Sequence, residues 1–156
     1  MSQRPSFDVS KLSTPDKILG GGALLLFIDS FLAWQRVCVD FGALGLAKVC
    51  ASANAWGGNG GFFGTLMAIF ALLLVVGMAL TLAGVAMPQG VPVPTVMAAL
   101  TGGTVLFGLI KFLIAVTKQG SFGAYLGLIL ILAVAYGGYM KMQEGKASPP
   151  SGGPIT

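Results

Sequence analysis

Residues 60–87 read GGFFGTLMAIFALLLVVGMALTLAGVAM, a stretch that contains no charged side chain. At about 1.5 Å per residue, an α-helix of this length exceeds the roughly 30 Å hydrocarbon thickness of a bilayer, which about 20 residues can cross. A helix on the surface of a soluble protein would carry polar residues along one whole face, and this stretch has only two threonines, Thr65 and Thr81. We therefore predict a membrane-spanning helix over residues 61–86.

The composition of the whole chain agrees with a membrane protein. Of the 156 residues, 55% are hydrophobic and only 9% are charged, and the mean hydropathy is +0.87. Soluble domains carry about a quarter charged residues. The net charge of +4 and the two cysteines also exclude a disordered chain, a basic nucleic-acid binder and a cysteine-dense secreted scaffold. The lipid bilayer is the expected partner, and nucleic acid is not.

Three further apolar segments predict additional spans. The sequence MPQGVPVP at 87–94 ends the span at 61–86, because prolines remove backbone donors and glycine suits a turn. Apolar runs then predict spans at about 95–116 and 122–141, and an earlier run predicts a first span at about 17–34. The expected fold is an all-α membrane protein, a four-helix transmembrane bundle at 15–142.

The two ends of the chain are polar. Residues 1–14 are assigned to an N-terminal tail and residues 143–156 to a disordered C-terminal tail. The stretch from Thr14 to Lys17 predicts the start of the first helix, with Thr14 as N-cap, Pro15 at the first helical position and Asp16 beside the positive end of the helix dipole.

Basic residues predict the orientation in the membrane. Four spans place both termini on one side, together with Arg4, Lys11, Lys17, Lys141 and Lys146. The opposite side holds Arg36, Lys48 and Lys118. This bias and the location of both cysteines in the opposite loop predict that the N- and C-termini are cytoplasmic.

The outer loop, residues 35–60, contains a pattern that fits a β-hairpin. If Cys38 faces Cys50 in an antiparallel pair, the two cysteines lie within disulfide reach. The connection at 43–45 then ends in glycine, as a type I turn with a G1 bulge requires. The alternative is a pair of free buried thiols. The register separates polar from apolar pairs: Asp40–Lys48 and Arg36–Ser52 on one face, Val39–Val49, Phe41–Ala47 and Val37–Ala51 on the other.

Two tryptophans flank this hairpin. Trp34 and Trp56 lie at the expected membrane crossings, where tryptophan is enriched at the interface, and simple packing is the alternative. The glycine-rich segment at 52–61 returns the chain to the membrane. Its backbone amides could bind an anion, but it lacks a phosphate-binding motif with a lysine.

Two charges fall inside predicted spans. Asp29 and Lys111 lie at similar depths, about 8 to 9 Å below the same interface, so an ion pair would reduce the cost of burying either one. In the alternatives, Lys111 extends toward water and Asp29 bonds to water or loop amides, or Asp29 couples proton movement.

Small residues mark faces on three of the spans. Glycines spaced by about one helical turn allow close helix packing in lipid, either within the chain or against a partner. The candidate positions are Gly60, Gly64, Gly102, Gly123, Gly127 and Gly137.

Three stretches resemble small uncharacterised four-helix membrane proteins of actinobacteria: GGALLLFIDSFLAWQRV at 21–37, SANAWGG at 52–58 and GAYLG at 123–127. This resemblance implies a bacterial plasma membrane and no known activity. The layout is also similar to claudin-type tetraspan proteins, in which a tryptophan and two cysteines occupy a β-rich first outer loop, here Trp34, Cys38 and Cys50.

The functional expectation is a non-catalytic protein without cofactor or metal. The chain lacks histidine, the commonest general base and metal ligand, and two cysteines cannot complete a tetrahedral zinc site. We expect a structural or accessory subunit of a larger membrane complex, whose partners are other membrane proteins or itself. The main alternative is a small dimeric proton-coupled transporter that resembles four-helix multidrug exporters and uses Asp29.

Overall fold

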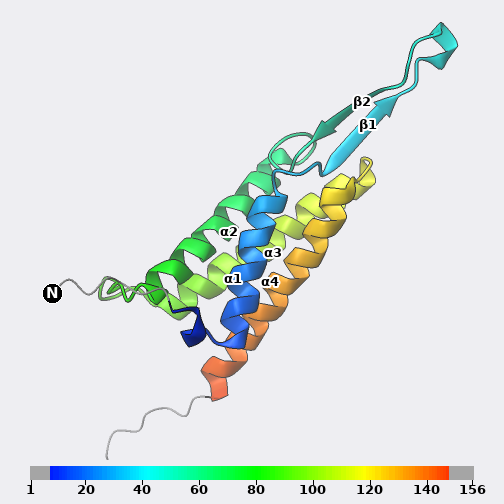
Figure 1. Cartoon of the computed structure of the whole chain (residues 1–156). Coiled ribbons are helices and arrows are strands. Elements are labelled where there is room, and N and C mark those ends of the chain that lie inside the picture. Colours follow the sequence, from blue (N-terminus) through cyan, green and yellow to red (C-terminus); the bar gives the residue numbers. More distant parts are fainter. Residues whose placement is uncertain (1–7, 148–156) are drawn as a thin grey trace, which may run out of the picture.

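The computed structural model describes residues 8–147 and contains a bundle of four helices with a β-hairpin beyond one end (Figure 1). The helices are α1 (Thr14–Asp29), α2 (Gly61–Leu82), α3 (Val93–Thr117) and α4 (Phe122–Ala147), and the strands are β1 (Gln35–Val39) and β2 (Val49–Ala53). Short 3₁₀ turns occupy Val9–Lys11 and Gly42–Leu44.

The helices form a four-cornered bundle. Helix α1 packs mainly against α4 and α2, and α3 packs mainly against α2 and α4. Helices α1 and α3 therefore occupy opposite corners. The start of α1 and the end of α4 lie at the end of the bundle away from the hairpin (Figure 1).

Three helices, α2, α3 and α4, are long and apolar enough to cross a membrane. Helix α1 has only 16 residues and ends at Asp29, so the predicted span to residue 34 is too long. The reason lies in the next residues, which turn and bond to other segments. The carbonyl of Ser30 accepts from the Ala55 amide (3.0 Å), and the carbonyl of Trp34 accepts from the Ser121 amide (2.9 Å).

The helix ends differ in detail from the sequence prediction. Ser13, not Thr14, caps α1: the Ser13 hydroxyl accepts from the Asp16 amide (3.4 Å) and donates to the Asp16 carboxylate (2.7 Å). Helix α2 stops at Leu82 rather than at residue 86, because Gly84 adopts a left-handed conformation (φ 67°) that ends the helix.

Helix α4 extends through residues 143–147, which the sequence analysis had assigned to the disordered tail. Good helix formers such as methionine, lysine, glutamine and glutamate follow the apolar part of α4, and they continue a helix that is already nucleated. The Gln143 side chain also donates to the Tyr139 hydroxyl one turn earlier (2.9 Å). Residues 148–156 of that tail and residues 1–7 of the N-terminal tail lie outside the described residues.

Glycines let the helices approach closely. A Cβ at Gly137 would lie 2.7 Å from the Leu19 backbone nitrogen, and one at Gly123 would lie 2.6 Å from the Ala33 carbonyl oxygen. At Gly64 a Cβ would overlap the carbonyl of Ala55. Gly137 lets α4 approach α1, and Gly123 lets it approach the turn after α1. Gly64 lets α2 approach the segment that precedes it.

Candidate functional site

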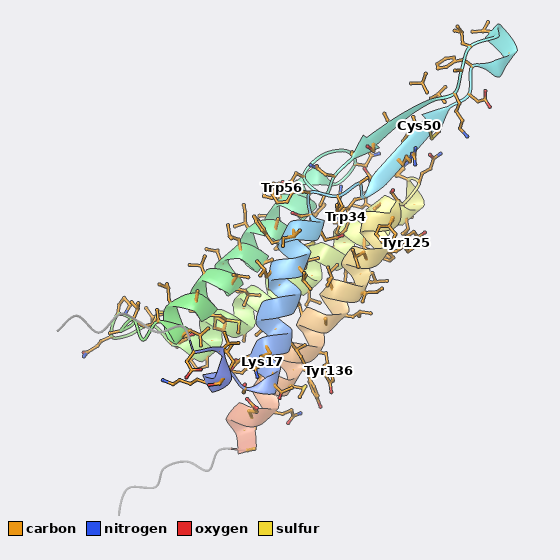
Figure 2. The ribbon with its side chains drawn as sticks, viewed as in Figure 1. Lys17, Trp34, Cys50, Trp56, Tyr125 and Tyr136 are labelled. Carbon is orange, nitrogen blue, oxygen red and sulfur yellow. A yellow bond between two sulfur atoms is a disulfide. The ribbon has the colours of Figure 1, made fainter. Side chains whose placement is uncertain are left out.

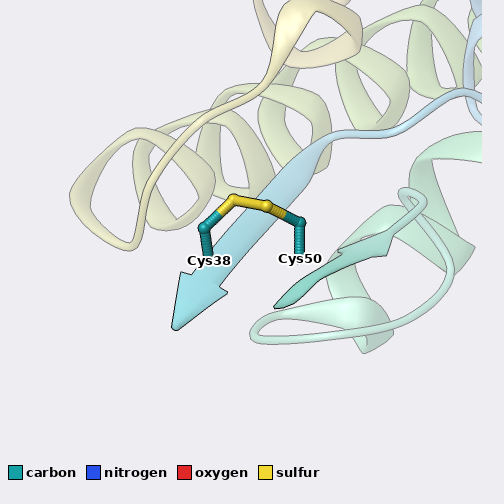
Figure 3. Close-up of a disulfide and its surroundings, with 2 residues drawn as sticks. All are labelled: Cys38 and Cys50. Atoms are coloured by element: carbon teal, nitrogen blue, oxygen red, sulfur yellow. A yellow bond between two sulfur atoms is a disulfide. The ribbon is translucent and has the colours of Figure 1, made fainter. Parts of the chain in front are cut away.

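The hairpin carries the predicted disulfide. Cys38 and Cys50 are bonded, with their Cα atoms 4.0 Å apart (Figure 3). Strands β1 and β2 pair antiparallel in the predicted register from Gln35↔Ala53 to Val39↔Val49. The disulfide closes a 12-residue separation, for which the chain-entropy estimate is about 3 kcal/mol of stabilisation.

The ladder is shorter than predicted. It ends at Val39↔Val49, so the expected pairs Asp40–Lys48 and Phe41–Ala47 do not form as strand pairs. The Asp40 carboxylate instead accepts from the Gly42 amide (2.8 Å) and starts the 3₁₀ turn. Gly45 has the positive φ (70°) that the predicted turn required, but the connection spans residues 40–48 rather than 43–45.

The hairpin has two chemically different faces. Successive strand residues point to opposite sides, so Arg36 and Ser52 share a face with the disulfide. The opposite face and the tip carry large apolar side chains that are exposed by these fractions: Val37 48%, Val39 48%, Phe41 37%, Leu44 75%, Leu46 61% and Val49 59%. We call these six residues the apolar ribbon.

The base of the hairpin is fixed to the bundle. Three backbone hydrogen bonds join residues 33–36 to the connection between α3 and α4 and to the start of α4: Arg36 N to Gln119 O (3.1 Å), Ser121 N to Trp34 O (2.9 Å) and Gly123 N to Ala33 O (3.0 Å). On the other side, the buried Gln35 side chain both donates to and accepts from the Asn59 backbone (3.1 and 3.0 Å). The hairpin therefore projects as a rigid extension of the helices.

Lys111 holds the glycine-rich segment that precedes α2. Its side chain is fully buried, and Nζ donates to the carbonyl oxygens of Gly57 (3.0 Å) and Asn59 (2.9 Å). Carbonyl oxygens, not amides, thus face the ammonium group. In this arrangement the segment covers the hairpin end of the bundle. These contacts give no support to the idea that its backbone amides bind an anion.

Asp29 ends α1 inside the core. The residue is 2% exposed, and within residues 8–147 neither carboxylate oxygen has a hydrogen-bond partner. The carboxylate lies against α4, where a Cβ at Gly127 would be 2.8 Å from Oδ2. A buried carboxylate without donors is costly, so this side chain is the most unusual polar group in the described bundle.

The predicted Asp29–Lys111 ion pair is wrong. Neither Asp29 carboxylate oxygen has a hydrogen-bond partner among the described residues, and both hydrogen bonds of Lys111 Nζ go to loop carbonyls. The physical reason is the position of the helices. Matching depth is not enough, because α1 and α3 lie at opposite corners and Asp29 faces α4.

The tryptophans are packing residues at the hairpin end (Figure 2). Trp34 is fully buried, and its indole N–H donates to the Asp29 carbonyl (3.1 Å), as the packing alternative expects; the interfacial position stays a prediction. Trp56 is half-buried, donates to the Ser30 hydroxyl (2.9 Å) and contacts the rings of Phe27 and Phe31.

The candidate glycines divide into packed and open positions. A Cβ at Gly127 would meet the Trp34 ring as well as Asp29, and one at Gly60 would lie 2.8 Å from Ile114. Gly102, by contrast, is exposed on α3, and a Cβ there would have no neighbour within 4 Å. The prediction of a packing face therefore does not hold for Gly102 within the chain. Its neighbour Gly103 packs instead, against Phe70.

Two functional contacts had no signal in the sequence. The bonds from Lys111 to the loop carbonyls and from Gln35 to Asn59 use backbone atoms, which any residue supplies.

No group of three or more histidine, cysteine, aspartate or glutamate side chains within residues 8–147 could hold a metal ion. No known protein family, curated protein or solved structure matches this chain.

Proposed function

We propose that this protein is a non-catalytic, multi-pass integral membrane protein that acts as a structural or accessory subunit of a membrane assembly. In this proposal the bundle lies in a bacterial plasma membrane, the termini face the cytoplasm, and the hairpin stands in water on the other side. The apolar ribbon is the observation that carries the proposal, because a disulfide-closed hairpin fixed to a rigid base presents uncovered apolar side chains.

The helix surfaces support placement in lipid. Large apolar side chains are exposed along α2, α3 and α4, including Leu73, Leu113 and Ile129 at 45, 60 and 63%. Exposing so many apolar side chains to water would be unfavourable, whereas contact with the acyl chains of a bilayer would not be. Helix α1 completes the bundle by packing against α4 and α2.

The glycine faces contribute less to partner binding than the sequence predicts. Gly64, Gly123, Gly127 and Gly137 are occupied by contacts within the chain, so they are not available to another subunit. Gly102 remains an open position on α3. The hairpin is therefore the stronger candidate for the surface that holds the assembly together.

Chemical cross-linking in intact cells, followed by purification in mild detergent, tests this function. We expect a defined membrane protein to be cross-linked to the wild-type chain in fixed stoichiometry, and to be lost with Leu44→Asp. The matched control is Ser52→Asp, which adds the same charge on the disulfide face and should keep the partner. Retention of every cross-linked protein by Leu44→Asp would contradict a role for the hairpin.

A second candidate function is proton-coupled transport by a dimer, and the buried, unpartnered carboxylate of Asp29 favours it. Reconstituted vesicles separate the two functions. A proton flux that the wild-type chain supports and Asp29→Asn abolishes would establish transport, whereas the absence of flux in both would support the structural role.

A further inference from the structure

The apolar ribbon is large enough for the centre of a protein interface. Its six side chains together expose roughly 500 Å², near the upper end of the largest apolar patch on a typical monomer. A standard interface buries about 800 Å² per partner, and homodimer interfaces are about 65% apolar. The area exposed by the ribbon is therefore about equal to the apolar part of one partner's side of such an interface.

The hairpin does not need this face for its own folding. The disulfide and the backbone bonds at the base hold the hairpin in place, and no described residue covers the ribbon. An isolated two-stranded ribbon in water has no core beneath it. The exposed face is therefore available to a second molecule.

We propose that the occupant is the apolar ribbon of a second copy of this chain. The ribbon is uniform, with aliphatic side chains and one phenylalanine, and offers no charge that would select a charged partner. Arg36 lies on the opposite face of the ladder, so face-to-face contact of two ribbons brings no like charges of the ladder together. This inference rests on the proposed function, since it assumes that the bundle lies in a membrane and the hairpin in water.

Membrane symmetry favours contact through faces rather than strand edges. Two copies inserted in the same orientation are related by an axis along the membrane normal. The hairpin extends beyond the bundle along its long direction, so this axis runs roughly parallel to the strands (Figure 1). Two sheets can pack face to face about such an axis, about 10 Å apart.

Edge pairing is a poorer solution for the same reason. An antiparallel pair of identical strands needs a two-fold axis perpendicular to the strands, which two copies in one membrane do not share. The outer edge of β1 is also occupied at its base, where Arg36 N donates to Gln119 O and Gln35 bridges Gly120. The two ribbons therefore meet through Val39, Val49 and their neighbours on the same face.

The test measures the oligomeric state of the purified full-length chain, alone, in lipid vesicles at low protein density. Single-molecule photobleaching should count two copies for the wild-type chain. Val39→Lys and Val49→Lys each place a charge in the centre of the ribbon and should weaken dimerisation at least tenfold. The matched control is Ser52→Lys, on the disulfide face, which should remain dimeric.

A titration of thiols in each unfolded, non-reduced variant verifies that the hairpin has formed, since a closed disulfide leaves no reactive thiol. If a strand variant lost its disulfide, the test would use Leu44→Lys instead. Leu44 belongs to the ribbon but lies in the turn outside the ladder, so a change there should leave strand pairing intact. A monomeric wild-type chain would overturn the inference and leave the ribbon to a different protein or a lipid surface. Dimers that resist all three lysines would overturn it as well, by showing that the helices make the contact.

This experiment also separates the two proposals. A wild-type monomer that still cross-links to a defined membrane protein in cells would refute self-association and leave the accessory function intact. A dimer without any other partner in cells would support self-association and refute the larger assembly.

Discussion

Gly127 is a position in the core where a side chain has no room. Its missing side chain leaves room for the Trp34 ring and the Asp29 carboxylate, both fully enclosed between α1 and α4. The Trp34 N–H in turn holds the last carbonyl of α1. A single absent methyl group thus allows the turn at 30–34 to fold into the bundle.

Gly127→Ala should destabilise the bundle, because its Cβ would overlap the Trp34 ring and lie 2.8 Å from Asp29 Oδ2. Overpacking of this kind costs about 1–3 kcal/mol. Gly102→Ala is the matched control: its Cβ meets open space, and alanine improves helix propensity by up to about 1 kcal/mol. Thermal unfolding in detergent should show a lower midpoint for the first variant only, and equal midpoints would contradict the packing described for Gly127.

Lys111 and Asp29 should act independently on stability. Lys111→Met leaves the Gly57 carbonyl without its side-chain donor and the Asn59 carbonyl with Gln35 Nε2 alone, so we expect a loss of about 1–3 kcal/mol. Asp29→Asn removes a carboxylate that has no described donor and should not offset that loss. A double-mutant cycle measures this, and a double variant whose stability departs by more than about 1 kcal/mol from the sum of the two single effects would show that the two charges are coupled after all.

At the scale of elements, helix α1 shows what a hydropathy pattern can predict and what it cannot. The apolar run predicts a helix that starts near residue 14, and the structure contains one. Its end depends on Ser30 and Trp34, whose carbonyls bond to residues 55 and 121, far away in the sequence. Such partners have no local signal, so the predicted span was too long.

The hairpin shows the opposite case. Its register could be predicted because one pairing brings the cysteines together and separates the two faces, and the ladder from Gln35↔Ala53 to Val39↔Val49 confirms it. The turn could not be predicted at the same accuracy, since the Asp40 carboxylate bonds to the Gly42 amide and ends the ladder early. The failed Asp29–Lys111 prediction has a third cause: depth along a helix does not specify which neighbour a side chain faces.

Helices α1 and α4 are joined at the end opposite the hairpin by the salt bridge of Asp16 with Lys141 (2.6 Å). Burial raises the pKa of the Asp16 carboxyl, but hydrogen bonds from Lys141 and Ser13 outweigh it and leave the pKa below its usual value. A carboxyl with a lowered pKa in the folded state stabilises the protein above its unfolded pKa of about 3.9, and this stabilisation is lost as the pH falls through the lower folded pKa.

The wild-type chain should therefore be more stable than Asp16→Asn at pH 7, by about 0.5 kcal/mol for a partly exposed pair, and the difference should shrink below about pH 4. Unfolding midpoints in detergent across this range measure it. Lys141→Met serves as the control because it removes the same pair from the other side. A difference that grows as the pH falls would contradict the assignment.

For the whole molecule, the proposed placement in a membrane accounts for the arrangement of the chain. Helices α2, α3 and α4 expose apolar side chains along their length, while the salt bridge Asp16–Lys141 joins the start of α1 to α4 at the end of the bundle away from the hairpin (Figure 1). Charges inside the bundle are few, and Lys111 is compensated by carbonyl oxygens of the capping segment. A rigid bundle that carries a projecting apolar ribbon is suited to assembly.

In the proposed topology the bundle lies in the membrane, with the hairpin on one side and the end of α4 on the other. Single cysteines introduced as Leu44→Cys, in the hairpin turn, and Gly145→Cys, in the last turn of α4, test it directly with a membrane-impermeant maleimide on intact cells. The native chain is the background control, since its Cys38–Cys50 disulfide offers no thiol. We predict labelling of Leu44→Cys in intact cells and of Gly145→Cys only after lysis; equal labelling of both before lysis would contradict the account.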